Sequence, residues 1–289
     1  MNIRWQMLVG SCLSLLLLLA GRATAQQPAG QLIIASVDES TAPTILLRAY
    51  GMDGQGNPLV LSPQTVELRH GGSPASSVST AGTFQAGTFT IFVIDAPPGV
   101  ESQLEQVQQA IEAYASPANM VEGVDYLAIY LIGESEASQL LAPTNFHNAV
   151  RNFFADPLAV QTGPTALVDS LGDLLQQVGA LKPKPDIYTS LVVFTDGTDV
   201  VSSAFEADEI GPLAAERGIP IHTIWLENEN LQPFSQQAGQ DYLAALAAES
   251  RAVAARIDQE TEVQVLWDRI GAFREHTVLQ YVPENLSGG

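Results

Sequence analysis

The stretch FTIFVIDAPPGVESQLEQV, residues 89–107, reads as a buried strand that ends at an acid and leads into a helix. Apolar and β-branched residues fill positions 89–94, which is typical of a strand buried on both faces. Asp95 ends this run, and the next four residues, APPG, bring no polar side-chain atom. Because a carboxylate at the tip of a strand commonly holds a ligand or a neighbouring loop, Asp95 marks the first candidate site.

Strand-like and helix-like patterns alternate from Thr88 onward. The strand-like runs are 124–132, 188–195 and 219–225, and the helix-like runs are 100–115, 145–154, 165–178, 204–217 and 242–248. This alternation predicts a doubly wound, mostly parallel α/β sheet flanked by helices, with ligand sites at the carboxyl ends of its strands. Residues 227–240 are predicted to form a long polar loop, 263–273 a helix and 277–282 a final strand.

Residues before this region have a different pattern, in which short strand-like runs are separated by turns. In the turn DGQGN, residues 53–57, Gly and Asn tolerate positive φ, and the alternating oxygen ligands and distal Glu of a calcium loop are absent. We therefore predict a hairpin turn within a small β-rich segment, residues 26–85. A segment of this size has a marginal core, so it should pack on the main domain, residues 86–284, which is followed by a polar tail at 285–289.

The N-terminal 25 residues have the pattern of a signal peptide. Arg4 gives a positive start, residues 7–20 form an apolar run that is short for a membrane span, and ATA at 23–25 fits a cleavage site. An uncleaved anchor is the alternative. Export to the periplasm, the cell surface or the medium is therefore predicted. Cys12, the only cysteine, lies within this segment, so the mature chain would have no disulfide, no cysteine metal site and no membrane span.

The chain is strongly acidic, with 12 Lys and Arg against 32 Asp and Glu and a formal charge of −20. Removing residues 1–25 removes two arginines and no acid, which leaves 10 bases against 32 acids, a charge of −22. Such a chain lacks the basic clusters that neutralise phosphates, so nucleic acid is excluded as a partner and anionic lipid is disfavoured. The acid excess indicates a soluble exported surface, with a dedicated cation-binding role as the alternative.

Two further stretches extend the pattern that begins at Asp95. In TGPTALVDSL, residues 162–171, Thr165 stands at a helix start, and in SLVVFTDGTDV, residues 190–200, a strand ends at Asp196. A strand followed by Asp, then a Thr at a helix start, then a strand followed by Thr-Asp-Gly, together with the closing LQYV, resembles a von Willebrand factor type A domain. The resemblance covers residues 86–282.

The resemblance implies a metal-ion-dependent adhesion site at the top of the sheet. In that family the first loop reads Asp-x-Ser-x-Ser, and a Thr and a second Asp come from two other loops. By position, Asp95, Thr165 and Asp196 match the first Asp, the Thr and the second Asp, whereas Pro97 and Gly99 stand where the two serines belong. Since Mg²⁺ demands near-ideal octahedral oxygen geometry, the loss of two hydroxyl ligands predicts a degenerate site without a cofactor.

Two nearby acids bear on that prediction. Asp169 and Asp199 could act as accessory ligands; otherwise Asp169 is an acid favoured at a helix start and Asp199 a solvated loop acid. A weak Mg²⁺ or Mn²⁺ site therefore stays open as an alternative.

Motifs for catalysis are missing. The sequence contains no GxSxG elbow, HExxH pair or P-loop, and Pro97 replaces the second acid that a haloacid-dehalogenase-like site requires. We therefore expect no enzymatic activity. The predicted function is an exported protein-binding module for adhesion or assembly that uses the loops at the top of the sheet to contact another protein. The alternatives are a weak Mg²⁺- or Mn²⁺-dependent adhesion domain and a structural assembly component with a vestigial site.

Overall fold

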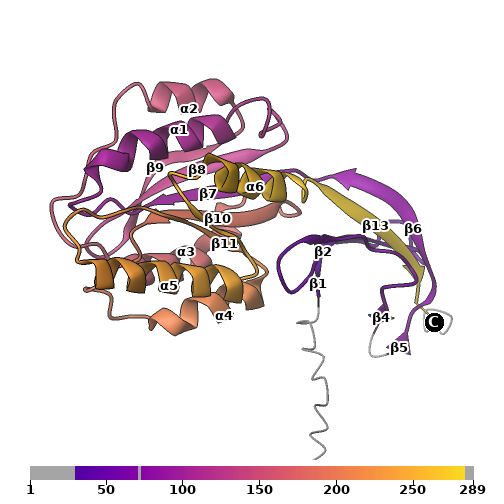
Figure 1. The fold of residues 1–289 in the computed structure, drawn as a ribbon. Coiled ribbons are helices and arrows are strands. Elements are labelled where there is room, and N and C mark those ends of the chain that lie inside the picture. Colours follow the sequence, from indigo (N-terminus) through magenta and orange to yellow (C-terminus); the bar gives the residue numbers. More distant parts are fainter. Residues whose placement is uncertain (1–29, 71–72, 284–289) are drawn as a thin grey trace, which may run out of the picture.

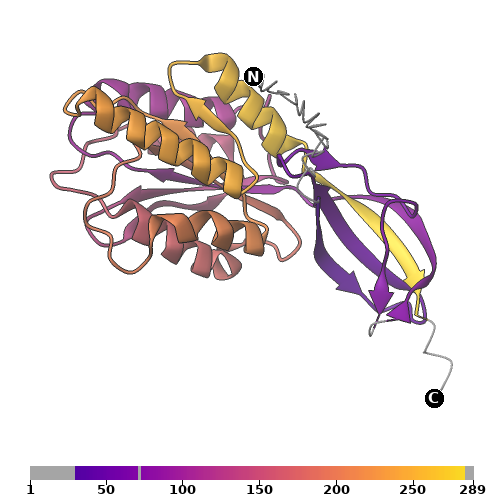
Figure 2. The same ribbon diagram turned by 60° about the horizontal axis from the view of Figure 1, so that its bottom comes forward.

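The computed structural model describes residues 30–70 and 73–283, so the predicted signal peptide and the polar tail lie outside the described residues. A six-stranded mixed sheet is covered by helices on both faces, and an antiparallel sheet extends from one end of it (Figures 1 and 2). The predicted α/β fold with a small N-terminal β segment is confirmed. Within the described residues, no helix is long and apolar enough to cross a membrane.

The main sheet has the strand order β12-β11-β10-β7-β8-β9. Its strands are β7 (Thr88–Ile94), β8 (Tyr126–Ile132), β9 (Ala137–Thr144), β10 (Tyr188–Thr195), β11 (Ile221–Trp225) and β12 (Ala254–Arg256). All neighbours are parallel except β9, which runs antiparallel to β8. The chain moves outward from β7 to β8 and returns to β10 on the other side, so the loops after β7 and β10 flank the switch point where such sheets bind ligands.

Helices cover the two faces of this sheet in separate groups. They are α1 (Leu104–Tyr114), preceded by a 3-10 turn at Glu101–Gln103, α2 (His147–Phe153), α3 (Leu167–Leu181), α4 (Ala207–Arg217), α5 (Pro233–Glu249) and α6 (Glu260–Gly271). Helices α1, α2 and α6 pack with Phe92 and Phe194 on one face. Helices α3, α4 and α5 pack with Ile91 and Val193 on the other (Figure 1). The alternation of side chains along β7 and β10 thus supplies both cores.

One predicted element is wrong, because residues 233–240 are helical and belong to α5. Pro233 stands in the first turn, where its missing N–H costs nothing and its fixed φ suits a helix. The first half of α5 is mainly polar, and its buried residues, apart from Gly239, lie in the second half. Strands β9 and β12 were not predicted, since β9 is largely exposed and β12 has only three residues.

The antiparallel sheet has the order β1-β2-β13-β6, with β3 paired to β2. Its strands are β1 (Gln31–Asp38), β2 (Ile45–Met52), β3 (Pro58–Leu59), β6 (Ser76–Gln85) and β13 (Glu275–Val282), and β4 (Arg69–His70) pairs with β5 (Ser73–Pro74) beside it. The predicted last strand therefore exists, but it joins this sheet rather than the main one. The α/β domain is inserted between β6 and β13, which are adjacent strands of the smaller sheet. The turn after β2 forms as predicted, with Asp53 accepting two backbone N–H bonds and Gly56 at φ 75°.

Aromatic rings and an ion pair join the two sheets. Tyr50 of β2 lies edge-on to Tyr188 of β10, with ring centroids 5.4 Å apart, and Arg48 pairs with Asp186 at 2.6 Å. Both contacts are at the end of the main sheet where β10 begins. The opposite end, where the parallel strands finish, is free of the smaller sheet (Figure 1). We call this end, with its loops, the carboxyl edge.

Candidate functional site

The structure brings the three predicted site residues together at the carboxyl edge. Asp95 follows β7, Asp196 follows β10, and Thr165 lies two residues before α3; all three are buried. The Thr195 hydroxyl donates a 2.6 Å hydrogen bond to Asp95 Oδ2, which ties the ends of β7 and β10 to each other. The predicted convergence is therefore found.

Asp95 is a fully buried carboxyl with only one side-chain hydrogen bond. Its Oδ1 has no hydrogen-bond partner among the described residues. Burial raises the pKa of Asp95 to about 7, the nearby hydroxyls of Thr165 and Thr195 oppose this rise, and the charges of Asp196 and Asp199 add to it. The Thr165 hydroxyl thus lies close enough to Asp95 to lower its pKa, although its geometry does not meet that of a hydrogen bond to Oδ1.

Asp196 is committed to intramolecular bonds through both oxygens. Its Oδ1 accepts hydrogen bonds from the backbone N–H and the hydroxyl of Thr198, each at 2.8 Å. Its Oδ2 accepts a 2.6 Å bond from Nδ2 of Asn228, a buried residue in the loop between β11 and α5. Because Asn228 Oδ1 in turn accepts the N–H of Asn230, the orientation of the amide is fixed at both ends.

Asn228 also explains the glycine at position 99. Gly99 has φ 109°, a conformation that side chains disfavour, and a Cβ there would lie 2.0 Å from Asn228 Oδ1. The Asn228 amide therefore fills the space into which a serine at position 99 would project. The departure from the family pattern at Gly99 is matched by a side chain from another loop.

Further hydrogen bonds hold the loop after β7 to the loop after β11. The Glu229 N–H donates to the Gly99 carbonyl at 2.8 Å, and the Ser102 hydroxyl donates to Glu229 Oε1 at 2.8 Å. Gln103 and Glu227 exchange two bonds between the Gln103 side chain and the Glu227 backbone. These contacts fix the two loops relative to each other.

The two accessory acids have structural partners. Asp199 accepts the N–H groups of Val168, Val201 and Ser202, so it caps the start of α3 and holds its own loop. The interpretation of Asp199 as a solvated loop acid is wrong. Asp169, in the first turn of α3, accepts the N–H groups of the three successive residues 203–205. Both acids fasten the loop after β10 to α3.

The donor set at Asp95 does not fit a hard divalent cation. Such an ion needs about six oxygen ligands in a regular arrangement. Positions 97 and 99 offer no side-chain oxygen, both Asp196 oxygens accept hydrogen bonds already, and the Asn228 amide directs an N–H group toward Asp196. The described residues contain no group of three or more His, Cys, Asp or Glu arranged to hold a metal ion.

Sequence reasoning found Asp95, Thr165 and Asp196 but missed Asn228 and Thr195. Thr195 is the last residue of β10, and its hydroxyl reaches Asp95 at the end of the neighbouring strand β7. Asn228 comes from a loop more than 120 residues away from Gly99 in the chain. The available signal was the glycine itself, which implies that something occupies the space beside it.

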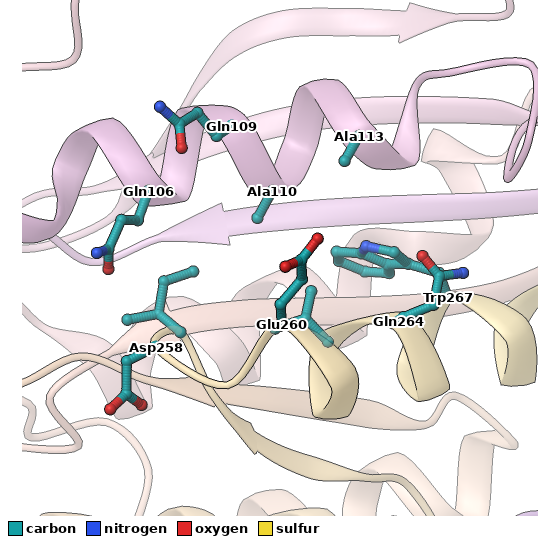
Figure 3. A pocket seen from close by; sticks show the side chains of 10 residues that line it. Gln106, Gln109, Ala110, Ala113, Asp258, Glu260, Gln264 and Trp267 are labelled. Carbon is teal, nitrogen blue, oxygen red and sulfur yellow. The ribbon is translucent and has the colours of Figure 1, made fainter.

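A groove on a helix-covered face lies apart from this site. It has a volume of about 330 Å³ and separates α1 from α6, with Ala110 and Ala113 on one side and Val263 and Trp267 on the other (Figure 3). Its polar lining consists of glutamines together with Asp258 and Glu260. None of the residues at the carboxyl edge described above lines this groove.

No family model matches the sequence, and no curated protein matches it. Among solved structures, the ArnB paralog VWA2 from Sulfolobus acidocaldarius is 12% identical, with a TM-score of 0.44 over 83% of this chain and 54% of that chain. Proximal thread matrix protein 1 from the mussel byssus is 15% identical, with a TM-score of 0.45 over 70% of this chain and 49% of that one.

A third similar structure is the same byssus protein "with zinc occupied MIDAS motif", which is 15% identical, with a TM-score of 0.45 over 68% of this chain and 48% of that one. The chain thus spans about half the length of the structures that it matches.

Proposed function

We propose that the protein is an exported, non-catalytic binding module that contacts another protein through the carboxyl edge without a bound cation. The observation that carries this proposal is a pair of exposed apolar side chains beside the site. Val200, in the loop after β10, is 81% exposed, and Phe234, in the first turn of α5, is 84% exposed. Exposed apolar side chains that gather on one surface are typical of protein-interaction sites.

The segments that carry these two residues are in direct contact. A Cβ added at Gly239 of α5 would lie 2.2 Å from the Asp196 carbonyl oxygen, and one at Gly197 would lie 2.5 Å from the Gly239 carbonyl oxygen. The loop after β10 and the first turns of α5 therefore approach each other backbone to backbone. Both apolar side chains belong to the same end of the molecule as Asp95.

Cation independence is supported by the Asn228 amide and by the hydrogen bonds that already bind Asp196. A non-catalytic role is supported by the hydrogen bonds of the acids at this edge. Asp196, Asp199 and Asp169 each accept hydrogen bonds that hold loops in place. Export is supported by the sequence pattern of residues 1–25 and by the single cysteine inside it.

The test is an affinity capture from the envelope fraction of the source organism, with and without a chelator. The variants are V200S/F234S and the control V60S, since Val60 is 90% exposed but lies beside β3, in the smaller sheet. We expect a partner that the wild type and V60S retain, that V200S/F234S loses, and that the chelator does not release.

Release by the chelator would favour the alternative of a weak Mg²⁺- or Mn²⁺-dependent adhesion domain. Retention by V200S/F234S would favour the other alternative, a structural component that makes its contacts elsewhere.

A further inference from the structure

We propose that the carboxyl edge receives a basic segment of the partner protein, rich in Lys or Arg and carrying an apolar side chain. This inference rests on the proposed function and specifies the chemistry of the partner. It is drawn from the distribution of charge between the two ends of the main sheet.

The loops of the carboxyl edge contain acids and no bases. They comprise residues 95–103, 133–136, 155–166, 196–206 and 226–232, and none of these segments contains Lys, Arg or His. Hydrogen bonds link them at several points, among them Gln161 N–H to the Ala96 carbonyl and Ala166 N–H to the Gly133 carbonyl. The exposed acids on these loops are Glu101, Glu134, Glu136, Asp156, Glu206, Glu227 and Glu229.

The bases of the α/β domain gather at the opposite end. Those that lie in loops or helix ends leading into the starts of strands are Lys182, Lys184, Arg217, Arg251 and Arg274. Arg269, in the last turn of α6, also lies toward that end, where it donates to the Gln55 carbonyl. Two bases do not fit this pattern. Arg256 ends β12 at the carboxyl edge, where two 2.9 Å bonds pair it with Asp258, and Arg151 lies in the last turn of α2, before the loop 155–166, and donates to Asn148 Oδ1. The carboxyl edge therefore presents a one-signed negative field to an approaching partner.

A buried polar atom at the centre of this surface adds an independent observation. Asp95 lies at the floor of the loop cluster, and its Oδ1 has no partner among the described residues although the side chain is fully buried. Because this oxygen is closed to solvent, it offers a partner no direct contact, and the ionised carboxylate adds negative charge beneath the surface loops. Val200 and Phe234 supply apolar contact area beside it.

These features select among possible occupants. A partner carboxylate would meet exposed acids at this edge and would be repelled, whereas Lys or Arg would be attracted and could donate hydrogen bonds. A second copy of the chain is disfavoured, because it carries a formal charge of −20 and its own bases lie mostly at the other end. In a cationic protein segment with one apolar side chain, the bases would pair with the exposed acids and the apolar side chain would contact Val200 and Phe234.

The test uses the full chain, expressed with its own leader and purified, and three fluorescent peptides of equal length. Each peptide carries one Phe and one Leu, set among Lys and Arg, among Glu, or among Ser and Gly. Fluorescence anisotropy at low and at physiological salt measures binding. We expect the basic peptide to bind, more weakly at higher salt because the charges are screened, and the acidic peptide to show no binding.

Charge-neutralising variants locate the contact. E227Q/D208N removes one exposed acid of the carboxyl-edge loops and one in the first turn of α4, directly after the loop 196–206. E122Q/E216Q removes two exposed acids at the opposite end, and no hydrogen bond involves any of these four side chains. The first pair should weaken binding of the basic peptide about three- to tenfold, and the second pair should leave it within about twofold. Equal melting temperatures confirm that all variants fold.

Two results would overturn the inference: binding of the basic peptide no tighter than that of the Ser/Gly peptide, or equal weakening by both variant pairs. Either result leaves the proposed function intact if V200S/F234S still loses the partner captured from the envelope, and that partner then docks through a segment of another charge. The peptide experiment thus tests the charge of the partner, and the envelope capture separately tests the proposed function.

Discussion

Replacing Gly99 with Ser tests whether the Asn228 amide occupies the place of the missing hydroxyl. The substitution introduces the serine that the von Willebrand factor type A pattern has at this position, yet the structure predicts that it destabilises the protein. A side chain at φ 109° costs about 1–3 kcal/mol in backbone strain, and its Cβ would lie 2.0 Å from Asn228 Oδ1. Displacing a buried side chain in this way costs about 1–3 kcal/mol more. The free energy of unfolding should therefore fall by about 2–6 kcal/mol.

A matched control separates these two costs. Gly123 also has a positive φ, 81°, but a Cβ there meets no atom within 4 Å, so G123S reports backbone strain alone. The variants G99S, G123S, N228A and G99S/N228A are compared by urea unfolding followed by circular dichroism. Because N228A clears the space beside position 99, the double variant should lose about 1–3 kcal/mol less than the sum of its two single variants.

Equal destabilisation by G99S and G123S would refute this reasoning, since it would mean that Asn228 yields without cost. Strict additivity of G99S and N228A would do the same. Either outcome would also favour a P97S/G99S variant, which supplies the two missing hydroxyls, as a route to a cation site; the contact with Asn228 argues against that route.

Three further results are expected. D95N should become more stable than the wild type as pH rises from about 4 to 7, because burial raises the pKa of Asp95 to about 7 in the folded state and penalises its charged form. By pH 8 the difference in the free energy of unfolding between the two proteins should have changed by about 4 kcal/mol. A pH-independent difference in urea unfolding would contradict this expectation. R274A should lower the free energy of unfolding by about 3–5 kcal/mol, since Arg274 Nε donates a 2.7 Å bond to the fully buried Asp125. Adding D125N to R274A should recover part of that loss, as measured by thermal unfolding. Calorimetry with Mg²⁺ or Mn²⁺ should show affinity no better than millimolar, and micromolar binding would reverse the degenerate-site prediction.

The central strands could be predicted from the sequence because they are buried on both faces. Strand β10 has the predicted bounds, Tyr188–Thr195, and each of its residues is buried. Its apolar centre, residues 191–194, and its β-branched threonines mark it as a buried strand. The start of α5 could not be predicted in the same way. Its first turns are mainly polar, and a polar run beginning with proline is equally compatible with a loop.

The placement of β13 depends on long-range pairing that a local pattern does not specify. Its residues alternate, with Leu279 and Tyr281 buried and Gln280 between them less so, and alternation of this kind favours an antiparallel sheet with one solvated face. This alternation differs from the pattern of the fully buried strands β7 and β10, but the sequence predicted only a final strand and not the sheet to which it belongs. It could not identify β2 and β6 as the neighbours, because their pairing with β13 closes loops of roughly two hundred residues in each case.

The site shows the same division between local and long-range information. Asp95 and Asp196 follow from strand ends, whereas Asn228 acts on them only because parallel strands bring distant loops to one edge. The hydrogen bonds that link Gly99, Ser102 and Glu229 fix these loops without any ligand. A surface whose loops are already fixed loses little conformational entropy on binding, so more of the contact energy contributes to affinity. This rigidity gives the exposed Val200 and Phe234 a defined position from which to contact a partner, and the acids around them determine which charge that partner must carry.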